Sequence, residues 1–217
     1  MTNQNDTPQA YPHSRDGAGL EGMPASLSAL ISRAQENQSR PPVERWNPDH
    51  CGALDMRIAA DGSWHYMGSP IGREALVRLF ASVLRKDEDG ETYLVTPVEK
   101  IAITVDDAPF QAVEMAFDGD PDARGGLTFR TNVGDVVAVD ADHPLRFAVE
   151  ASSGGLKAYV LVRGRLEALL TRALMFDLVA LADEGQGEYA GHFGVASGSD
   201  FFAICPMADV ERFGAMI

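Results

Sequence analysis

Apolar and polar positions between residues 61 and 85 alternate first with the period of a strand and then with that of a helix. Trp64 and Tyr66 flank a polar position, which is the two-residue period of a half-buried strand. The apolar positions that follow have helical spacing and form one stripe, made of Leu76, Leu79, Phe80, Val83 and Leu84. The pattern predicts a strand followed directly by an amphipathic helix.

The start and end of this helix also have sequence signals. Ser69 is a suitable N-cap because its hydroxyl accepts from free amides of the first turn, and Pro70 suits the first helical position. The acidic segment 86–90 contains a glycine and is expected to end the helix, and strand character resumes at 93–95. We therefore expect one complete strand–helix–strand unit here.

Short strands dominate the sequence around this unit. The segment 54–59 alternates and should form a hairpin with the Trp64 strand through the Asp61-Gly62 turn. Further candidates, separated by turn signals, predict an antiparallel sheet or partial barrel; they are 101–105, 112–117, 127–131, 136–139 and 146–149. A closing hairpin is predicted from 192–195 and 201–205.

A second unit with the same order of elements is predicted near residue 160. A strand at 156–162 leads into Arg163, ninety residues after Arg73, and five apolar positions lie ninety residues after the first stripe: Leu166, Leu169, Leu170, Ala173 and Leu174. Many amphipathic helices would align by chance over five positions, but the shared order of flanking elements favours a duplication. The fold class predicted is α+β, with two domains of small antiparallel sheets, each with a packed helix.

The predicted domain organisation follows from these patterns. Residues 1–42 are expected to be a disordered lead-in that contains a short amphipathic helix at 24–36. The first α+β domain is placed at 43–95 and the second at 96–207, and 208–217 is a tail.

Composition excludes several classes of partner. The 217 residues carry a net charge of −14, which disfavours nucleic acid backbones and anionic membrane surfaces. Two cysteines far apart in the sequence, Cys51 and Cys205, are too few for a disulfide scaffold. There is no apolar stretch of a signal peptide or membrane span, so a cytoplasmic protein is expected.

The two predicted helix starts each contain an arginine, and these are candidate anion sites. A helix N-terminus with exposed amides and an arginine suits a phosphate or carboxylate. The alternative is that Arg73 and Arg163 form internal salt bridges, and the many carboxylates of this acidic sequence favour that alternative.

Other polar and aromatic residues extend this hypothesis. Lys100, Arg130 and Asn132 have the composition of a binding rim, although an asparagine before Gly134 also simply suits a turn. Trp46 and Tyr66, like Trp64, could stack on a base or anchor the core, and the second use is commoner.

No motif of a known enzyme class occurs in the sequence. The segment 68–72 lacks the lysine of a phosphate-binding loop, and the adjacent His50 and Cys51 have no second pair of metal ligands at useful spacing. Cys51 is expected to be a small buried apolar residue. The sequence therefore gives no support for catalysis, predicts no metal site and leaves any cofactor open.

Five segments of the sequence are similar to a bacterial family named domain of unknown function 1285. They are WNPDHCGALDMRI, DGSWHYMGSPIGREALVRLFASVLR, YLVTPVEK, FRTNVGD with DHPLRF, and YVLVRGRLEALLTRAL. The resemblance spans about residues 43–207. It implies a new fold with a duplicated α+β core, whose second domain resembles a pleckstrin-homology-like fold.

The resemblance also implies a nucleotide-like ligand between the two domains and a role in signal transduction. Carried onto this chain, the ligand-binding residues would be Trp46, Arg57, Tyr66, Arg73, Lys100, Arg130 and Asn132. The function expected is a cytoplasmic ligand-sensing module for a small anionic or nucleotide-type ligand. The alternative is a protein–protein interaction module without a small ligand.

Overall fold

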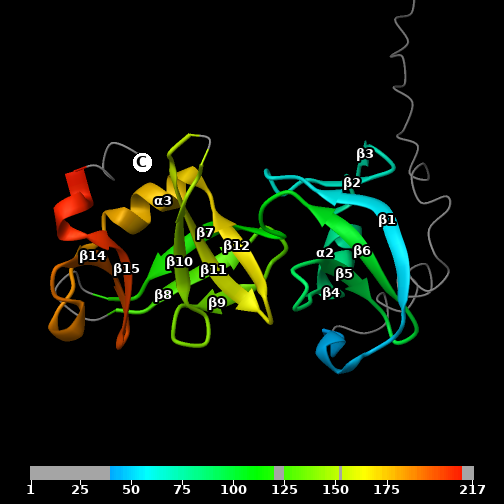
Figure 1. Cartoon of the computed structure of the whole chain (residues 1–217), viewed down its shortest axis with the longest axis horizontal. Coiled ribbons are helices and arrows are strands. Elements are labelled where there is room, and N and C mark those ends of the chain that lie inside the picture. Colours follow the sequence, from blue (N-terminus) through cyan, green and yellow to red (C-terminus); the bar gives the residue numbers. More distant parts are fainter. Residues whose placement is uncertain (1–39, 120–124, 152, 212–217) are drawn as a thin grey trace, which may run out of the picture.

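The structure is a computed structural model that describes residues 40–119, 125–151 and 153–211 (Figure 1). Two six-stranded sheets lie side by side along the long axis, and a three-stranded sheet lies at the C-terminal end (Figure 1). Strands account for most of the regular structure, so the protein has two sheet-rich domains with few helices, which is more β than the α+β class predicted from the sequence.

The first half of the chain forms the first sheet, with strand order β3-β2-β1-β6-β5-β4. It begins with a short 3-10 helix, η1, and contains one α-helix, α2. The elements are η1 (Val43–Arg45), β1 (His50–Ile58), β2 (Trp64–Tyr66), β3 (Ser69–Pro70), α2 (Glu74–Ser82), β4 (Leu84–Lys86), β5 (Thr92–Val95) and β6 (Lys100–Val105).

The second half forms a sheet with strand order β10-β11-β12-β7-β8-β9. Its elements are β7 (Phe110–Phe117), β8 (Leu127–Thr131), β9 (Val136–Ala138), β10 (Leu145–Val149), β11 (Leu156–Arg163), β12 (Leu166–Leu170) and α3 (Arg172–Val179). The third sheet and its connections follow: β13 (Asp183–Glu184), η2 (Gly187–Tyr189), β14 (His192–Ser197), β15 (Asp200–Pro206) and η3 (Met207–Asp209). The closing hairpin predicted from the sequence is β14–β15.

The two large sheets have the same topology. In each, the first and last strands pair in parallel at the centre, β1 with β6 and β7 with β12. All other neighbours pair antiparallel, and the two outermost strands are the third and fourth in chain order. This identity of strand order supports the predicted duplication, although the sheets are mixed and not purely antiparallel as expected.

The helices lie at different places in the two halves, which contradicts the predicted repeat of ninety residues. α2 connects β3 to β4, whereas α3 follows the last strand of the second sheet. The predicted helix from Arg163 is the strand β12, because Gly164 at φ +52° makes a tight turn and a strand then returns along β11. Its buried positions alternate, since Leu166, Ala168 and Leu170 are all buried.

The helix α2 begins later than predicted. Met67 and Gly68 both have positive φ, and the chain reverses there so that Tyr66 pairs with Ser69. Pro70 therefore lies in the short edge strand β3, a position where a missing amide costs little, and Arg73 is the N-cap. The helix ends at Ser82, because the next residues turn into β4.

The hydrophobic core runs through both halves and holds most of the predicted apolar stripe. Phe80 is fully buried and its ring stacks on Trp64 at 6.2 Å between centroids. Val83 and Leu84 are also fully buried, although they belong to the helix end and to β4. The predicted apolar stripe therefore identified Val83 and Leu84 as core residues, although α2 ends before them at Ser82.

The first sheet extends beyond residue 95, where the first domain was expected to end. β6 lies between β1 and β5 in that sheet, so the first half continues to Val105. The predicted helix at 24–36 and the tail beyond residue 211 lie outside the described residues. Among the helices that the structure describes, none is long and apolar enough to cross a membrane.

Candidate functional site

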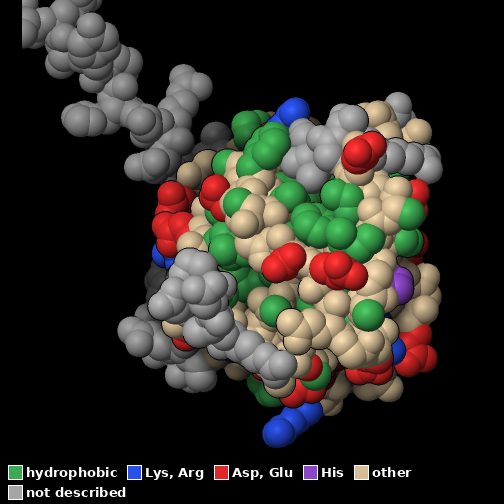
Figure 2. Space-filling model, turned by 90° about the vertical axis from the view of Figure 1, so that its left-hand side faces the viewer, with side chains coloured by type: hydrophobic (Ala, Val, Ile, Leu, Met, Phe, Trp, Pro, Cys, Tyr) green, Lys and Arg blue, Asp and Glu red, His purple; other side chains and the backbone are tan. Residues whose placement is uncertain are grey.

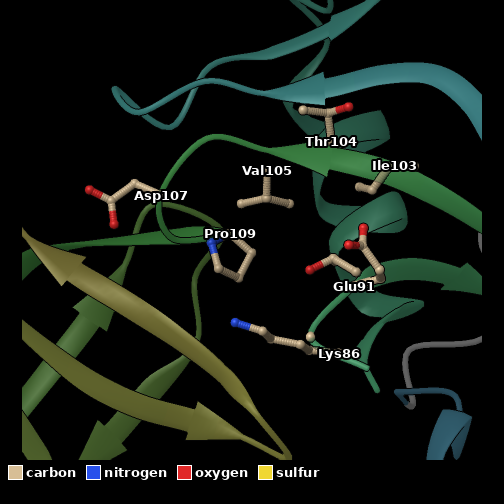
Figure 3. A pocket seen from close by; sticks show the side chains of 9 residues that line it. Lys86, Glu91, Ile103, Thr104, Val105, Asp107 and Pro109 are labelled. Carbon is tan, nitrogen blue, oxygen red and sulfur yellow. The ribbon is translucent and has the colours of Figure 1, made fainter. Parts of the chain in front are cut away.

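A pocket of about 230 Å³ lies beside the segment that joins the two halves (Figure 3). Its base follows from strand register, because Lys86 pairs with Thr92 and Thr92 pairs with Ile103 across β4, β5 and β6. The neighbouring row of the same sheet, Leu84, Leu94 and Ile101, is buried in the core. The pocket therefore lies over the row formed by Lys86, Thr92 and Ile103, two residues away on each strand from the row that is buried in the core.

The remaining wall comes from the end of β6 and from the connecting segment. Thr104 and Val105 follow Ile103, and Asp107 and Pro109 lie beyond the strand. Figure 3 shows the Lys86 side chain pointing across the space next to Pro109. Residues from the strand ends and from the junction therefore share one pocket.

Lys86 is the cation of this pocket, and no carboxylate of the described residues lies within ion-pair distance of it. By contrast, at least ten arginine and lysine side chains in the described part of the chain form ion pairs. Of the two acidic residues in the lining, Asp107 is neutralised by Lys157 at 2.9 Å, whereas Glu91 lies exposed. Lys86 is thus a half-buried cation held on a strand, with no ion-pair partner among the residues that the structure describes.

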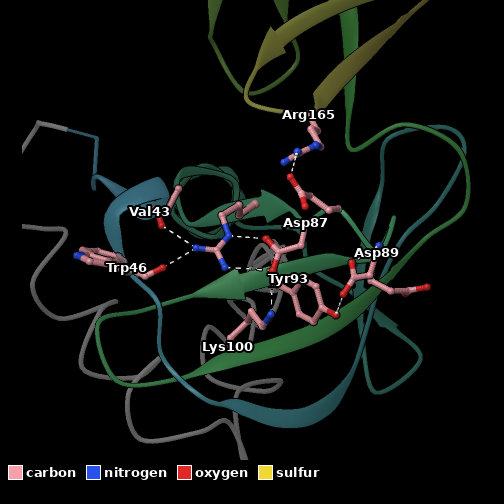
Figure 4. A network of polar contacts seen from close by, with 10 residues as sticks. Val43, Trp46, Asp87, Asp89, Tyr93, Lys100 and Arg165 are labelled. Atoms are coloured by element: carbon pink, nitrogen blue, oxygen red, sulfur yellow. Dashed lines mark hydrogen bonds and ion pairs between the residues drawn. The ribbon is translucent and has the colours of Figure 1, made fainter.

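A polar network lies close by in the sequence, centred on Arg85 (Figure 4). Arg85 is 8% exposed, and its guanidinium contacts both carboxylate oxygens of Asp87 at 2.6 and 3.1 Å. It also donates to the carbonyl oxygens of Val43 at 3.0 Å and Trp46 at 2.6 Å. Arg85 therefore fixes the chain around η1 onto the first sheet.

Lys100 and Tyr93 complete this network. Lys100 Nζ donates to Asp87 at 2.8 Å and lies 4.4 Å from the centre of the Tyr93 ring. The hydrogen bonds from Arg85 and Lys100 lower the pKa of the Asp87 carboxyl, because they favour its charged form. The Tyr93 hydroxyl donates to Asp89 at 2.7 Å, and this bond raises its pKa to about 12.

Several contacts join the two halves around these sites. Arg163 Nη2 donates to the carbonyl oxygen of Ala81 at 2.6 Å, and the same side chain pairs with Asp135. Arg165 pairs with Glu88 at 2.7 Å. Arg163 lies at the end of β11 and its charge is met internally, so the salt-bridge alternative holds for this residue.

The structure brings together only some of the predicted binding residues. Trp46 and Lys100 meet through Arg85 and Asp87, but Lys100 is already paired. Asn132 accepts from the Gln111 amide at 3.0 Å, next to the seam between the halves. These two groups lie in separate networks.

The other predicted residues are dispersed. Arg57 pairs with Asp106 at 2.8 Å, and Arg130 pairs with Glu114 at 2.6 Å. Tyr66 is 5% exposed, so its ring faces the core and has no free face for stacking. Arg73 is exposed and occupies the N-cap position of α2 without a side-chain capping hydrogen bond, one residue before the helix and not within its first turn as predicted.

Sequence reasoning missed Lys86, Arg85 and Asp87. The sequence pattern predicts the end of a helix in this segment, although LRKDEDGETYLV also has the pattern of a hairpin: a strand, an acidic turn with Gly90, and a strand. That reading places Lys86 opposite Thr92, as the structure has it. The hairpin pattern was the available signal, and the helical stripe obscured it.

The fold defines a two-domain, sheet-rich protein, and comparison with known proteins gives its family. The model of the N-terminal domain of DUF1285, a domain of unknown function, matches residues 41–108, and that of the C-terminal domain matches 109–204. The chain belongs to the DUF1285 family. The boundary between the two matches falls after β6, in agreement with the sheets.

Two solved structures are similar to this chain. A crystal structure of a DUF1285 family protein from Silicibacter pomeroyi is 42% identical with a TM-score of 0.76, covering 84% of this chain and 98% of that one. Another, from Shewanella baltica, is 27% identical with a TM-score of 0.47 and covers 59% and 92%. None of the curated proteins matches the sequence.

Proposed function

We propose that this protein is a cytoplasmic ligand-binding module that holds a small anion in the pocket at the junction of its halves. The observation that carries the proposal is Lys86, a pocket cation that forms no ion pair with any described residue, in a chain with a net charge of −14. A buried or half-buried lysine attracts an anionic group when no internal carboxylate neutralises it.

The size of the pocket limits the ligand. A volume of about 230 Å³ lies below the roughly 300–1,000 Å³ of pockets that enclose drug-sized molecules. The pocket therefore suits a single phosphate or carboxylate group with a small body. A nucleotide would place its phosphate at Lys86 and leave its base outside the pocket. Thr92 and Thr104 line the pocket, so their hydroxyls can donate hydrogen bonds to the phosphate but not to the base.

This proposal moves the charge contact from the arginines expected from the sequence to Lys86. Arg57 and Arg130 are neutralised by Asp106 and Glu114, and breaking such a pair would oppose ligand binding. Arg73 has no ion pair among the described residues, but it does not line the pocket. A role in signal transduction, and the pleckstrin-homology-like character of the second half, belong to the proposal as well.

The experiment is a thermal-shift titration with inorganic phosphate, acetate, and mono-, di- and cyclic nucleotides. A ligand that binds only the native state at 100 times its Kd stabilises it by about 2.7 kcal/mol. We expect a rise in Tm with phosphate-bearing compounds that is lost in Lys86→Gln. Glu91→Gln should strengthen binding, because it removes the like charge from the rim.

Arg73→Gln is the matched control, because it also removes one exposed cation but lies outside the pocket lining. It should titrate like the wild type. Equal shifts in the wild type and Lys86→Gln, or loss of the shift in Arg73→Gln alone, would refute the site. No shift at millimolar concentrations would refute small-anion binding altogether.

A second function, protein–protein interaction, is favoured by the C-terminal end of the molecule. Figure 2 shows hydrophobic side chains gathered on that end, with acidic side chains around them. Large apolar residues of its elements are exposed, among them Phe176 at 48% and Met207 at 38%. Exposed apolar patches of this kind commonly mark contact surfaces. Phe176→Ser should abolish a partner pull-down that survives Lys86→Gln.

A further inference from the structure

Two neighbouring carboxylates in the segment between β6 and β7 are held by opposite halves of the molecule. Asp106 and Asp107 directly follow the last strand of the first sheet, and the second sheet begins at Phe110. Adjacent Cα atoms are about 3.8 Å apart, so the two side chains share one short piece of backbone.

Asp106 is bound to the first half. Arg57 on β1 contacts both of its carboxylate oxygens, with Nε at 2.8 Å and Nη2 at 2.5 Å. The Asp106 amide also donates to the carbonyl oxygen of Ile58 at 3.0 Å. The paired guanidinium lowers the pKa of the Asp106 carboxyl, chiefly through these hydrogen bonds.

Asp107 is bound to the second half. Lys157 Nζ and the Tyr159 hydroxyl, both on β11, each donate to one of its oxygens at 2.9 Å. Lys157 also pairs with Glu150 at 2.5 Å, so its position is fixed from a second side. The Asp107 side chain is 16% exposed, and this contact is partly shielded from water.

The residues after the two aspartates are immobilised as well. Ala108 is 5% exposed and Phe110 is fully buried. The Arg163 guanidinium lies 4.8 Å from the centre of the Phe110 ring while it donates to Ala81 in the first half. After Asp106, the segment up to Phe110 therefore has no exposed residue that could serve as a free hinge.

We infer that Asp106 and Asp107 form a two-sided clamp that fixes the orientation of the two halves. Any rotation of one half against the other must break the contacts of one aspartate, because the backbone between them is too short to absorb it. The pocket beside Asp107 is then preformed and does not close by domain movement. The clamp stands whether or not the pocket binds an anion.

The test measures the distance distribution between spin labels on the two halves by pulsed electron resonance. Cys51 on β1 is a native cysteine that is exposed and not buried as expected from the sequence, and Ser199→Cys adds an exposed site in the turn between β14 and β15. Cys205 is buried, and protein without the added cysteine shows whether it takes up label. The unaltered clamp should give one narrow distribution, and Asp106→Ala with Asp107→Ala should broaden it or add a second peak.

Asp55→Ala with Asp142→Ala is the matched control, since it removes one exposed carboxylate from each half outside the clamp. It should leave the distribution narrow. A narrow, unchanged distribution in the Asp106 and Asp107 double variant would overturn the clamp.

Circular dichroism shows whether the double variant is folded. If it is not, Tyr159→Phe with Lys157→Met frees Asp107 while keeping the apolar bodies of both side chains. Broadening in that variant supports the clamp, and an unchanged distribution overturns it.

Discussion

The two halves share a strand order and also a local arrangement on equivalent strands, but they use it differently. Tyr93 on β5 donates to Asp89, and Tyr159 on β11, the equivalent strand, donates to Asp107. A cation lies over each ring, Lys100 at 4.4 Å and Arg146 at 4.0 Å. The same tyrosine–aspartate–cation arrangement thus occurs twice.

The aspartate that accepts from the tyrosine lies in a different kind of segment in each half. Asp89 lies in the turn just before β5 and Lys100 begins β6, so the first arrangement stays within the first sheet. Asp107 lies in the segment between the halves, so the second arrangement ties one domain to the connection with the other. A repeated topology thus serves internal stability in one copy and the assembly of the two domains in the other.

The largest effect is expected from Arg85→Met in the first half. The substitution keeps an apolar body but removes the bonds to Asp87, Val43 and Trp46, and it leaves a half-buried carboxylate with Lys100 alone. Breaking a buried ion pair of this kind costs about 3 kcal/mol. Urea denaturation should show this loss in the free energy of unfolding. A loss below about 1 kcal/mol would mean that the network contributes little.

An intermediate effect is expected from Tyr93→Phe and Tyr159→Phe, each of which removes one hydrogen bond worth about 1 kcal/mol. Both pKa values are raised to about 12, Tyr93 mainly by the bond to Asp89 and Tyr159 mainly by burial. Since the folded-state pKa lies above the unfolded value of about 10, this stability is complete below pH 10 and is lost as pH rises through 12.

Absorbance at 295 nm during an alkaline titration measures the ionisation of the tyrosines, and urea denaturation at each pH measures the stability. Each variant should lose one late-titrating tyrosine and part of the decline in stability between pH 10 and 12. If both tyrosines ionise near pH 10 in the native protein, the two hydrogen-bonded arrangements are wrong. If Tyr159→Phe broadens the distribution of distances between the spin labels and Tyr93→Phe does not, then the tyrosine of the second half holds the two domains together and that of the first half does not.

The smallest effect is expected from Arg146→Met in the second half. Arg146 pairs with Glu167 at 2.7 Å, but its side chain is 50% exposed. Exposed pairs contribute roughly 0.5 kcal/mol and are weakened by salt. Urea denaturation at low and high salt should show a small loss that shrinks as salt rises. A loss of unfolding free energy as large as that of Arg85→Met would contradict the expected difference between the buried Arg85 contacts and the exposed Arg146–Glu167 pair.

The two-residue alternation of apolar and polar positions predicts many of the strands. The sequence also predicts that the protein contains a duplicated domain. The hairpin of β1 and β2 and that of β14 and β15 are where the alternation placed them. The alignment of the repeat was wrong, because LEALLTRAL satisfies both a strand and a helix. Only the turn at Gly164 and the pairing with β7 select the strand.

The residues of the candidate site were less predictable than the fold. Arginines and aspartates can be counted from a sequence, but which of them pair depends on strands that meet from distant segments. Arg57 and Asp106 are 49 positions apart, and Arg163 reaches Ala81 across 82. Lys86 stands out only once the partners of the other cations are known.

The sequence by itself determined most of the buried apolar stripe of the first unit, the abundance of strands and an excess of acidic residues, because hydrophobicity, period and charge are local properties of the side chains. The tertiary structure alone decided that the strands form mixed sheets with a parallel central pair, which charges neutralise one another, and which lysine has no ion-pair partner in the described part of the chain. These depend on long-range pairing, whose energy is shared between segments that no local pattern connects.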